Sequence, residues 1–331
     1  MDTHLVVTSS PHLQEPDDVS RIMWRVVMAL APAAAVSVYL FGWDALRAYA
    51  LSIAAAEVTE LLCLKMRAKP LSHALDGSAV VTGMLLAMVL PPECAWYCHL
   101  VGGAFAIGIA KHAFGGLGNN IWNPALAARV FLQFAYPAQV SLSAWPVPQR
   151  LWGAAADAAT MASPLAKEGG VGGWGYLDLL FGNGVPGCLG ETCKVALIVG
   201  GVYLILTRTI DWRVPAAYIA TVFVLTWLLP TPQDAPAWAA DPLYHVLSGG
   251  LVIGAFFMAT DMVTTPVTPA GRAIFGVGCG LLVAVIRRYG GYPEGVAYSI
   301  VLMNTFTPLI DRWVKPRVYG ARTVKPTPGG A

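Results

Sequence analysis

Ten apolar stretches, interrupted by one long loop between the fifth and the sixth, constrain the fold of this chain more than any other feature. They lie at roughly 22–41, 46–64, 75–90, 95–113, 123–136, 194–207, 214–230, 243–262, 272–286 and 293–310. Of the 331 residues 56% are hydrophobic and 12% are charged, whereas a soluble domain carries about 25% charged residues. Most of the surface must therefore face an apolar phase. This predicts an all-α polytopic membrane protein with about ten transmembrane helices.

The basic residues predict an orientation. With a cytoplasmic N-terminus, most of the 21 Lys and Arg residues fall on the cytoplasmic side, as the positive-inside rule requires. Arg287-Arg288 is an exception, so either the last two segments are not a simple hairpin or this pair serves a site. Residues 1–20 lack the apolar core of a signal peptide, so the first helix is expected to be retained.

The resulting layout has five parts and two cytoplasmic termini. The net charge of +2 is too small to suggest a nucleic acid partner. The parts are a cytoplasmic segment 1–21, a first membrane half 22–136, a periplasmic loop 137–193, a second membrane half 194–310 and a basic cytoplasmic tail 311–331.

The two halves share a pattern of glycines followed by a capped helix start. Gly103 to Gly108 precedes Asn123-Pro124, and Gly250 to Gly254 precedes Thr268-Pro269. Asn or Thr caps a helix and Pro suits its first turn, so 123–136 and 272–286 are predicted to be broken or half helices. Five segments per half is an odd number, so a duplicated half would be inverted. Independent Gly-rich helix packing is the alternative explanation.

The loop 137–193 contains the segment Asp157-Ala-Ala-Thr-Met-Ala-Ser163. Its spacing resembles the flavin-attachment motif Asp-x-x-(Ser/Thr)-(Gly/Ala)-Ala-(Thr/Ser), which periplasmic FAD:protein FMN transferases modify. Met161 stands where the motif has Gly or Ala, and Ser163 stands at the acceptor position, where most such proteins have Thr. A plain linker of small residues is the alternative.

Further stretches carry a wider resemblance along residues 9 to 311. They are Ser9–His12, Ile22–Pro32, Leu75–Ala87, Lys111–Ala125, Gly190–Cys193, Phe257–Pro266 and Asn304–Asp311. Their order and spacing resemble the D subunit of the Rnf electron-transport complex, and they are also similar to the B subunit of the sodium-pumping NADH:quinone reductase.

This resemblance implies a flavoprotein subunit, rather than a complete enzyme, of an ion-translocating complex that links NADH and ferredoxin in the bacterial inner membrane. It implies FMN held by a phosphoester at Ser163, with Asp157 and Ala162 in the motif and Thr160 as a rival acceptor. A second, noncovalent flavin (riboflavin or FMN) and coupled movement of Na⁺ or H⁺ are also implied. The expected partners are Rnf subunits of the C, G, E, A and B types, the periplasmic FAD:protein FMN transferase and membrane lipid.

Polar residues near the fourth and fifth segments predict the noncovalent flavin site. Lys111, Asn119, Asn120 and Asn123 belong to a Gly-rich turn before a predicted half helix. A helix N-terminus favours phosphate, and amide side chains suit the edge of an isoalloxazine ring. A purely structural re-entrant turn is the alternative.

Acidic residues inside apolar segments are candidates for an ion path, because such residues are rare and usually functional or paired. Asp261 lies among threonines whose oxygens suit a hard cation, and the alternative is a salt bridge with Arg272. Glu57 and Glu60 share one helix face, and the alternative is pairing with Lys65 or Arg67.

The six cysteines give only a weak signal. Disulfides Cys94–Cys98 and Cys188–Cys193 are conceivable outside the membrane. No metal is predicted, because the spacings do not match ferredoxin patterns.

The main alternative to a redox subunit is a secondary transporter or channel with inverted repeats and no redox cofactor. A structural membrane scaffold is a third possibility. The flavin content of the chain distinguishes both from the redox subunit.

Overall fold

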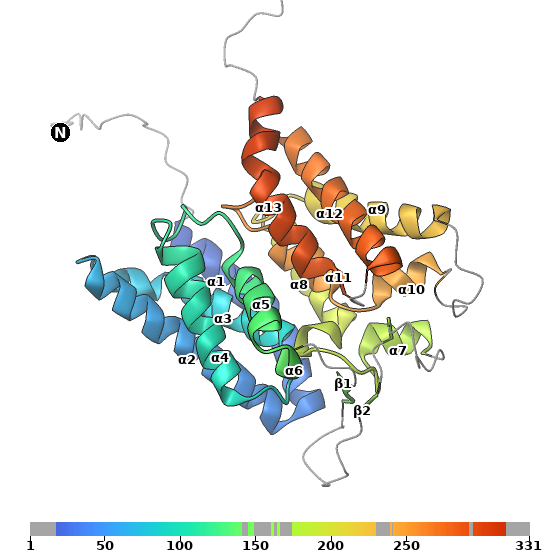
Figure 1. Ribbon diagram of the computed structural model, residues 1–331, viewed down its shortest axis with the longest axis horizontal. Helices are drawn as coiled ribbons and strands as arrows, with labels where there is room; N and C mark the ends of the chain where they lie inside the picture. The colour runs from blue at the N-terminus through green and yellow to red at the C-terminus, as the bar shows by residue number, and fades with distance from the viewer. Residues whose placement is uncertain are drawn as a thin grey trace, which may run out of the picture.

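The computed structural model describes residues 18–140, 145–148, 160–161, 164–165, 174–229, 239, 241–290 and 294–315. These ranges are predominantly helical. In Figure 1 the helices of the first half (blue to green) lie beside those of the second half (yellow to red).

The first half contains long helices on either side of a short central one. Its elements are α1 (Val19–Phe41), α2 (Trp43–Met66), the 3₁₀ turn η1 (Leu71–Asp76), α3 (Ser78–Val89), α4 (Trp96–Ala104), the π-helical η2 (Phe105–His112), α5 (Pro124–Ala135) and α6 (Pro137–Val140). Two short strands follow, β1 (Trp145–Pro146) and β2 (Thr160–Met161), which pair antiparallel with Trp145 opposite Met161.

The second half also has a short central helix, and this one is broken. Its elements are α7 (Tyr176–Phe181), η3 (Leu189–Glu191), α8 (Lys194–Leu206), α9 (Arg213–Leu228), α10 (Pro242–Leu247), α11 (Leu251–Ile253), the π-helical η5 (Gly254–Met258), α12 (Pro269–Tyr289) and α13 (Val296–Trp313).

Helices occupy all ten apolar stretches, but their lengths correct part of the prediction. Only α1 and α12, of the helices in the described ranges, are long and apolar enough to cross a membrane by themselves. The half-helix prediction for 272–286 is therefore wrong, because α12 has 21 residues. The short central helices are α3, with 12 residues, and the combined α11–η5 segment, 251–258. The arrangement of ten spans in inverted repeats stays a prediction.

Both predicted helix caps are present. Asn123 Oδ1 accepts hydrogen bonds from the amides of Ala125 (3.1 Å) and Leu126 (3.3 Å), and Pro124 occupies the first turn of α5. Thr268 Oγ1 accepts from the Gly271 amide at 3.0 Å, ahead of Pro269 in α12. These local bonds satisfy N–H groups that a helix start leaves unpaired.

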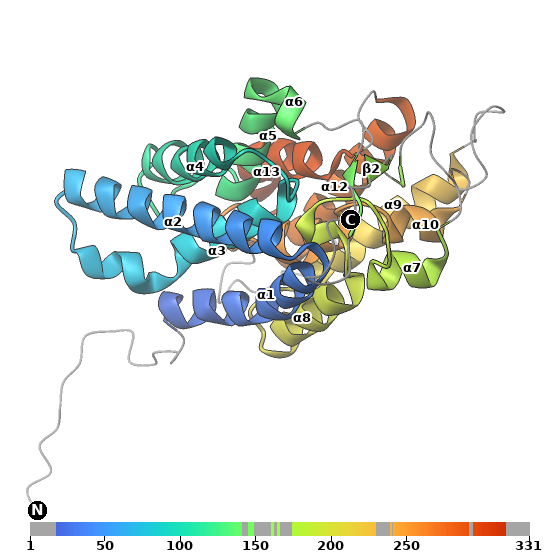
Figure 2. The same ribbon diagram turned by 90° about the horizontal axis from the view of Figure 1, so that it is seen from below.

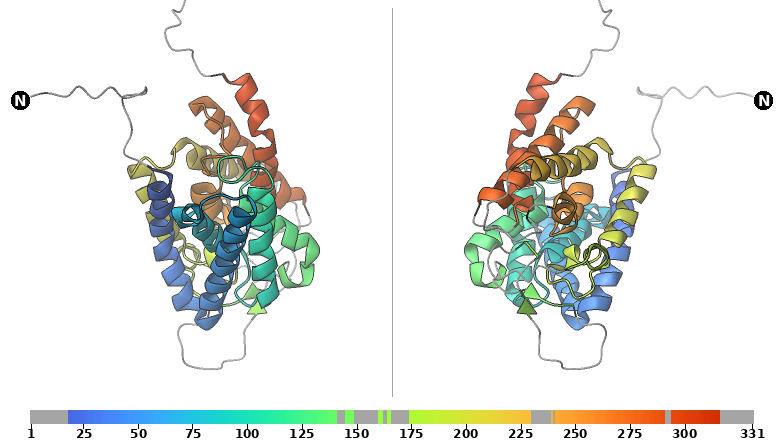
Figure 3. Two further views of the ribbon diagram at one scale, coloured as in Figure 1. Left: turned by 90° about the vertical axis from the view of Figure 1, so that its left-hand side faces the viewer. Right: turned by 90° about the vertical axis from the view of Figure 1, so that its right-hand side faces the viewer.

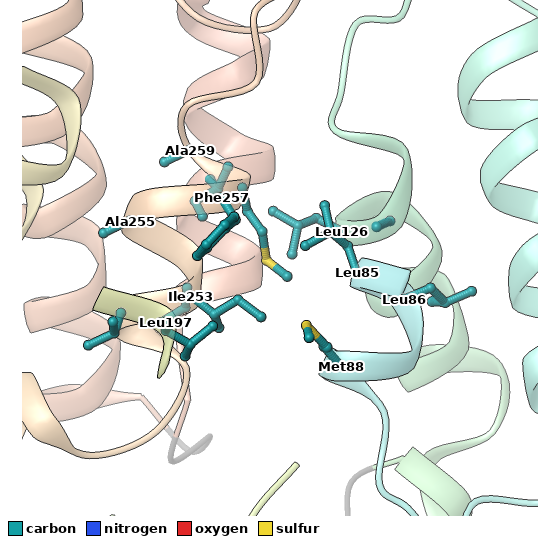
Figure 4. Packing of buried hydrophobic residues seen from close by; sticks show 14 of the residues in the cluster. Leu85, Leu86, Met88, Leu126, Leu197, Ile253, Ala255, Phe257 and Ala259 are labelled. Atoms are coloured by element: carbon teal, nitrogen blue, oxygen red, sulfur yellow. The ribbon is translucent and has the colours of Figure 1, made fainter. Parts of the chain in front are cut away.

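The halves meet along α1 and α8 and through a central apolar cluster. Helices α1 and α8 pack side by side (Figures 2 and 3). Their approach depends on Gly200, where any Cβ would overlap the Ala29 carbonyl oxygen. At the centre, α3 and α5 face α8, α11 and η5 (Figure 4). The labelled residues are Leu85, Leu86, Met88, Leu126, Leu197, Ile253, Ala255, Phe257 and Ala259.

Large apolar side chains also cover the outside of the helices. Trp43, Phe134 and Trp227 have 66%, 68% and 70% of their surface exposed. An exterior rich in such residues is typical of helices that face lipid or partner proteins.

Candidate functional site

A pocket between the two halves brings together most of the residues predicted for the noncovalent flavin and the ion path. Its cavity volume is about 80 Å³, and part of the pocket opens to the exterior. Segments of α1, α3, α8 and η5 contribute mainly apolar walls. The polar lining consists of Ser78, Thr82, Lys111, Asn120, Asn123, Thr209, Thr260 and Asp261.

Asn120 links the first half to Asp261 of the second. Its Nδ2 donates to the Trp122 carbonyl at 3.1 Å, and its side chain also hydrogen-bonds to Asp261. Its Oδ1 is buried without a hydrogen-bond partner among the described residues. A buried acceptor without a partner is costly, so this atom suits a ligand that carries an N–H or O–H donor.

Asn123 and Asn119 fit a flavin contact less well. The amide of Asn123 is occupied by the α5 cap and by a bond from its Nδ2 to the Met258 carbonyl at 3.2 Å. It therefore joins α5 to η5. Asn119 is exposed and does not line the pocket.

Lys111 lies in a buried charge cluster at the start of α3. Its Nζ donates to Glu60 Oε2 at 2.7 Å and to Ser78 Oγ at 2.8 Å, while His112 Nε2 lies 3.0 Å from Glu60 Oε1. We call Glu60, Ser78, Lys111 and His112 the α3 cluster. The partner of Glu60 is thus Lys111, and pairing with Lys65 or Arg67 is not observed in the described residues. Glu57, one turn earlier, is partly buried.

Asp261 does not pair with Arg272, which corrects the alternative offered from sequence. Arg272 Nη1 donates to Asp211 Oδ2 at 3.0 Å, and its Nε donates to the Pro266 carbonyl at 3.1 Å. The carboxyl of Asp261 instead accepts from Thr264 Oγ1 at 3.2 Å. The Thr264 hydroxyl is therefore already committed to Asp261.

The flavin-attachment motif falls largely outside the described residues, as Asp157, Ala162 and Ser163 do, while Thr160 lies in β2. The two residues after Ser163 are described. The Tyr244 hydroxyl donates to the Pro164 carbonyl at 3.4 Å, and Leu165 is buried. A Cβ on Gly249 would lie 3.1 Å from Leu165 Cδ1. The chain following the predicted acceptor therefore packs against the turn that begins α11.

A second cluster of charged side chains surrounds this turn, and sequence reasoning missed most of it. We call Glu191, Lys194, Arg287 and Glu294 the α11 cluster. The Gly250 amide donates to Glu294 Oε1 at 2.5 Å. Arg287 Nη1 and Nη2 donate to the carbonyls of His245 (2.5 Å) and Ser248 (3.1 Å). The Arg287-Arg288 exception in the charge pattern was the one signal that pointed to this region.

Helix α8 begins after Cys193 without a side-chain cap. Burial and the neighbouring Glu294 raise the pKa of the Glu191 carboxyl above its ordinary value.

All six cysteines are described and are free thiols, so neither conceivable disulfide is present.

Comparisons with known proteins agree along almost the whole chain. A family described as "NQR2, RnfD, RnfE family" matches residues 6–320. The D subunit of the Na⁺-translocating ferredoxin:NAD⁺ oxidoreductase complex of Acetobacterium woodii is 44% identical over 328 residues, 98% of each chain. The D subunit of the proton-translocating ferredoxin:NAD⁺ oxidoreductase complex of Clostridium ljungdahlii is 45% identical over 326 residues, 96% of each chain. The D subunit of the ion-translocating oxidoreductase complex of Halorhodospira halophila is 38% identical, and 95% of each chain is covered.

Proposed function

This chain belongs to the NQR2, RnfD, RnfE family, and from that premise we propose that it is the membrane-embedded D-type subunit of an ion-translocating ferredoxin:NAD⁺ oxidoreductase complex. The observation that carries the proposal is the similarity to relatives named as this subunit, at 44% and 45% identity over almost the full length. The exposed apolar exterior and the helices at all ten apolar stretches support a place in the bacterial inner membrane.

The proposed membrane layout has ten spans in two inverted halves, with both termini cytoplasmic and residues 137–193 periplasmic. Its support is the pair of short helices α3 and α11–η5, which face each other across the central apolar cluster (Figure 4). Each follows a left-handed glycine, Gly77 with φ 83° and Gly249 with φ 66°. Interrupted helices at corresponding positions of inverted halves are typical of midplane sites in transport proteins.

Covalent FMN at Ser163 is the redox group of the proposal. During attachment the hydroxyl oxygen bonds to the inner phosphorus of FAD, AMP leaves, and FMN stays as a phosphoester. The flavin supplies one- and two-electron chemistry when bound, and the protein positions it. Of the residues that follow Ser163, Pro164 accepts a hydrogen bond from Tyr244 and Leu165 packs beside Gly249.

The noncovalent flavin of the proposal occupies the pocket between the halves. The unpartnered Oδ1 of Asn120 can accept from a ring N–H, and the apolar walls from α1, α3 and η5 suit an aromatic ring. Lys111 reaches the same pocket while it is bound to Glu60.

The transported ion is Na⁺ or H⁺, and similarity does not distinguish them. Relatives of almost equal identity are named Na⁺-translocating and proton-translocating. Asp261, which lines the pocket, is the strongest ion-path residue of the proposal. Glu60 is already neutralised by Lys111, so Glu60 and Glu57 would contribute only if that pair opens.

The decisive experiment measures flavin fluorescence of the denatured chain in a gel. Coexpression with a periplasmic FAD:protein FMN transferase should give a fluorescent band that Ser163→Ala removes and Ser163→Thr keeps. Ser143→Ala, at a serine of the same loop outside the motif, is the matched control and should retain the band. A wild-type chain without fluorescence, with an unmodified mass, would exclude the redox role and favour the transporter.

The pocket flavin is tested separately, on the Ser163→Ala chain in native detergent. Asn120→Ala should lower the amount of flavin released on denaturation, because it removes the unpartnered acceptor. Asn119→Ala, at the exposed neighbouring amide, should leave it unchanged. Equal flavin content in both variants would place the second flavin elsewhere.

A further inference from the structure

A second polar pocket opens at the turn between α8 and α9, and the proposed function does not use it. Its cavity volume is about 600 Å³, within the range of roughly 300–1,000 Å³ that is typical of ligand sites. Three guanidinium groups line it, those of Arg208, Arg213 and Arg272, together with one carboxylate, that of Asp211. The lining therefore carries an excess of positive charge. We call it the arginine pocket.

Arg208 is the arginine of this pocket whose charge the fold leaves uncompensated. Asp211 Oδ2 accepts from Arg213 Nη1 at 2.9 Å and from Arg272 Nη1 at 3.0 Å. The Arg208 side chain is exposed and forms no hydrogen bond or ion pair with the part of the chain that the structure describes. Its φ of 55° lies in the left-handed region, which favours glycine. A strained arginine whose charge has no partner indicates a role in binding rather than in folding.

An apolar groove continues from the arginine pocket along α9. The pocket and the groove share Ile205 and Trp212, and the groove has a cavity volume of about 500 Å³. Trp212 is 57% exposed, and the Arg213 guanidinium carbon lies 5.6 Å from the centre of its ring. The residues that α9 itself contributes follow helical spacing, and we call their surface the α9 groove: Pro215, Ala216, Ile219, Ala220, Phe223 and Val224.

The α9 groove lies on the face of α9 opposite to its contact with α12. That contact is close, because a Cβ on Gly280 would lie 2.6 Å from Thr221 Cβ. On the groove face Ala216 and Ala220 are exposed, and their small side chains make the surface concave. Helices α9 and α10 lie at the edge of the second half, on the side away from the first half (Figures 1 and 2). The remaining walls come from α10 and η5: Leu243, Val246 and Phe256.

The length of the groove fits an acyl chain better than a transmembrane helix of a partner protein. Between Trp212 and Val224 the axis of α9 advances about 18 Å. This is close to one leaflet of a hydrocarbon core that is about 30 Å thick. A partner helix that crosses the bilayer would need the full thickness, with about 20 residues in contact with lipid or protein.

The charge at the end of the groove also favours a lipid. In the proposed membrane layout, on which this step rests, the turn between α8 and α9 is cytoplasmic. Basic pockets between helices on that side bind the head groups of anionic lipids. Transmembrane helices of partner proteins carry an excess of Lys and Arg at their cytoplasmic ends, so the three arginines of the pocket would repel them.

We propose that the arginine pocket and the α9 groove together bind one anionic phospholipid. The phosphate group lies at Arg208, with Arg213 and Arg272 close by, and one acyl chain lies along α9 between Trp212 and Val224. Arginine suits this role because its planar guanidinium can donate two parallel hydrogen bonds to phosphate oxygens. Trp212 lies between the two parts, as expected for an aromatic side chain at the level of the head groups.

The first experiment measures lipid binding by the full chain in an uncharged detergent, from the rise in melting temperature during a lipid titration. Long-chain phosphatidylglycerol should bind more tightly than phosphatidylcholine with the same chains, and more tightly than inorganic phosphate. Equal affinity for the two lipids would overturn the requirement for negative charge. Inorganic phosphate that binds as tightly as phosphatidylglycerol would make the pocket a phosphate site and overturn the lipid proposal.

Substitutions of Arg208 test the head-group position. Arg208→Gln should weaken phosphatidylglycerol binding about fivefold, the factor for one basic residue near an anionic lipid surface. Arg312→Gln, at an exposed arginine near the end of α13, is the matched control and should leave binding unchanged. Equal losses in the two variants would show general surface attraction and overturn the site.

Arg208→Gly separates binding from folding, because glycine adopts the left-handed conformation without strain. It should weaken lipid binding as Arg208→Gln does, while the melting temperature of the lipid-free chain does not fall. A lower melting temperature with unchanged lipid affinity would assign Arg208 a structural role and overturn its part in the proposal.

The acyl-chain position is tested by filling the groove. Ala220→Phe should lower the affinity for long-chain phosphatidylglycerol and leave the affinity for its dihexanoyl form unchanged. Ala35→Phe, at an exposed alanine of α1, is the matched control. Equal long-chain affinity in both variants would overturn the acyl-chain position.

A partner helix is the other occupant that the experiment can detect. If Ala220→Phe binds lipid normally but no longer copurifies with the other subunits of the proposed complex, the groove belongs to a partner helix and the lipid proposal is overturned. The binding measurements need neither flavin nor ion transport, so they can succeed or fail independently of the proposed function.

Discussion

The starts of the two short central helices, α3 and α11, share one backbone feature, but the charged side chains around them have different partners. Each follows a left-handed glycine, and each is reached by a base at the end of a later helix, Lys111 for α3 and Arg287 for α11. In the α3 cluster the base meets a carboxylate, Glu60, at 2.7 Å. In the α11 cluster the bases donate to backbone carbonyls, and Glu294 accepts from the Gly250 amide.

The difference is that one cluster contains a buried ion pair and the other, within the described ranges, does not. In the α3 cluster both carboxylate oxygens of Glu60 have a partner: Oε1 contacts His112 and Oε2 contacts Lys111. The acids of the α11 cluster form no such ion pair among the described residues, and Glu294 accepts from a backbone amide. The comparison predicts that the ion pair of the α3 cluster contributes more to stability than the charges of the α11 cluster do.

Breaking the Glu60–Lys111 pair should have the largest effect on stability. Lys111→Met leaves Glu60, which is 3% exposed, without its closest cation. Removing one partner of a buried pair costs about 3–5 kcal/mol, so the melting temperature in detergent should drop sharply. The double variant Glu60→Gln/Lys111→Met should recover most of the loss. If single and double variants melt together, the buried pair does not carry this stability.

Alanine substitution of the two glycines with left-handed backbone conformation, Gly77 and Gly249, gives the second test of the comparison. Gly77→Ala should cost roughly 1–2 kcal/mol, the penalty for a side chain in the left-handed region, with Trp24 Nε1 3.2 Å from the new Cβ. Gly249→Ala should cost more, because its Cβ also overlaps Glu294 Oε1. Thermal unfolding of the two variants measures the difference. Equal melting temperatures would mean that the Glu294 carboxylate moves freely away.

The helix caps give a smaller paired test. Thr268→Ala removes one cap bond and Asn123→Ala removes two, each within the usual range of about 0.5–2 kcal/mol. Asn123→Ala should be the more damaging, because it also removes the bond to the Met258 carbonyl that joins the halves. Chemical unfolding in mixed micelles can rank the two. The reverse order would show that the Asn123–Met258 bond contributes little.

The smallest effect is expected at Asp211, in the turn between α8 and α9. Burial acts to raise the pKa of this carboxyl, but bonds from the Arg213 amide and from the side chains of Arg272 and Arg213 outweigh it, so the pKa is lowered. The stability it contributes is present above the unfolded pKa, about 3.9, and is lost as pH falls through the folded value. Arg213 and Arg272 are 41% and 35% exposed, so solvent screening keeps the contribution below about 1 kcal/mol.

The measurement is the melting temperature of wild type and Asp211→Asn between about pH 6 and pH 3. The two plots of melting temperature against pH should converge as the pH falls. Protonation of Asp211 removes from the wild type the charge-dependent stabilisation that the Asp211→Asn variant lacks. A constant separation would show that the Asp211 contacts do not depend on its charge.

Local features of the fold were predictable because their causes lie within a few residues. The apolar runs placed helices at all ten stretches, and Asn123-Pro124 and Thr268-Pro269 identified two helix starts. Helix length was less predictable. The run 243–262 reads as one segment, but the turn at Ser248–Gly250 breaks it, with Gly249 in a left-handed conformation.

The sequence by itself determined the helical class, the helix starts and the family, because apolar runs, caps and ordered motifs are written in neighbouring residues. Only the tertiary structure decided which charges meet: Lys111 with Glu60, and Arg272 with Asp211 instead of Asp261. A buried charge must find a partner to offset the water it loses. The packing of distant helices settles which partner that is, and no local pattern records it.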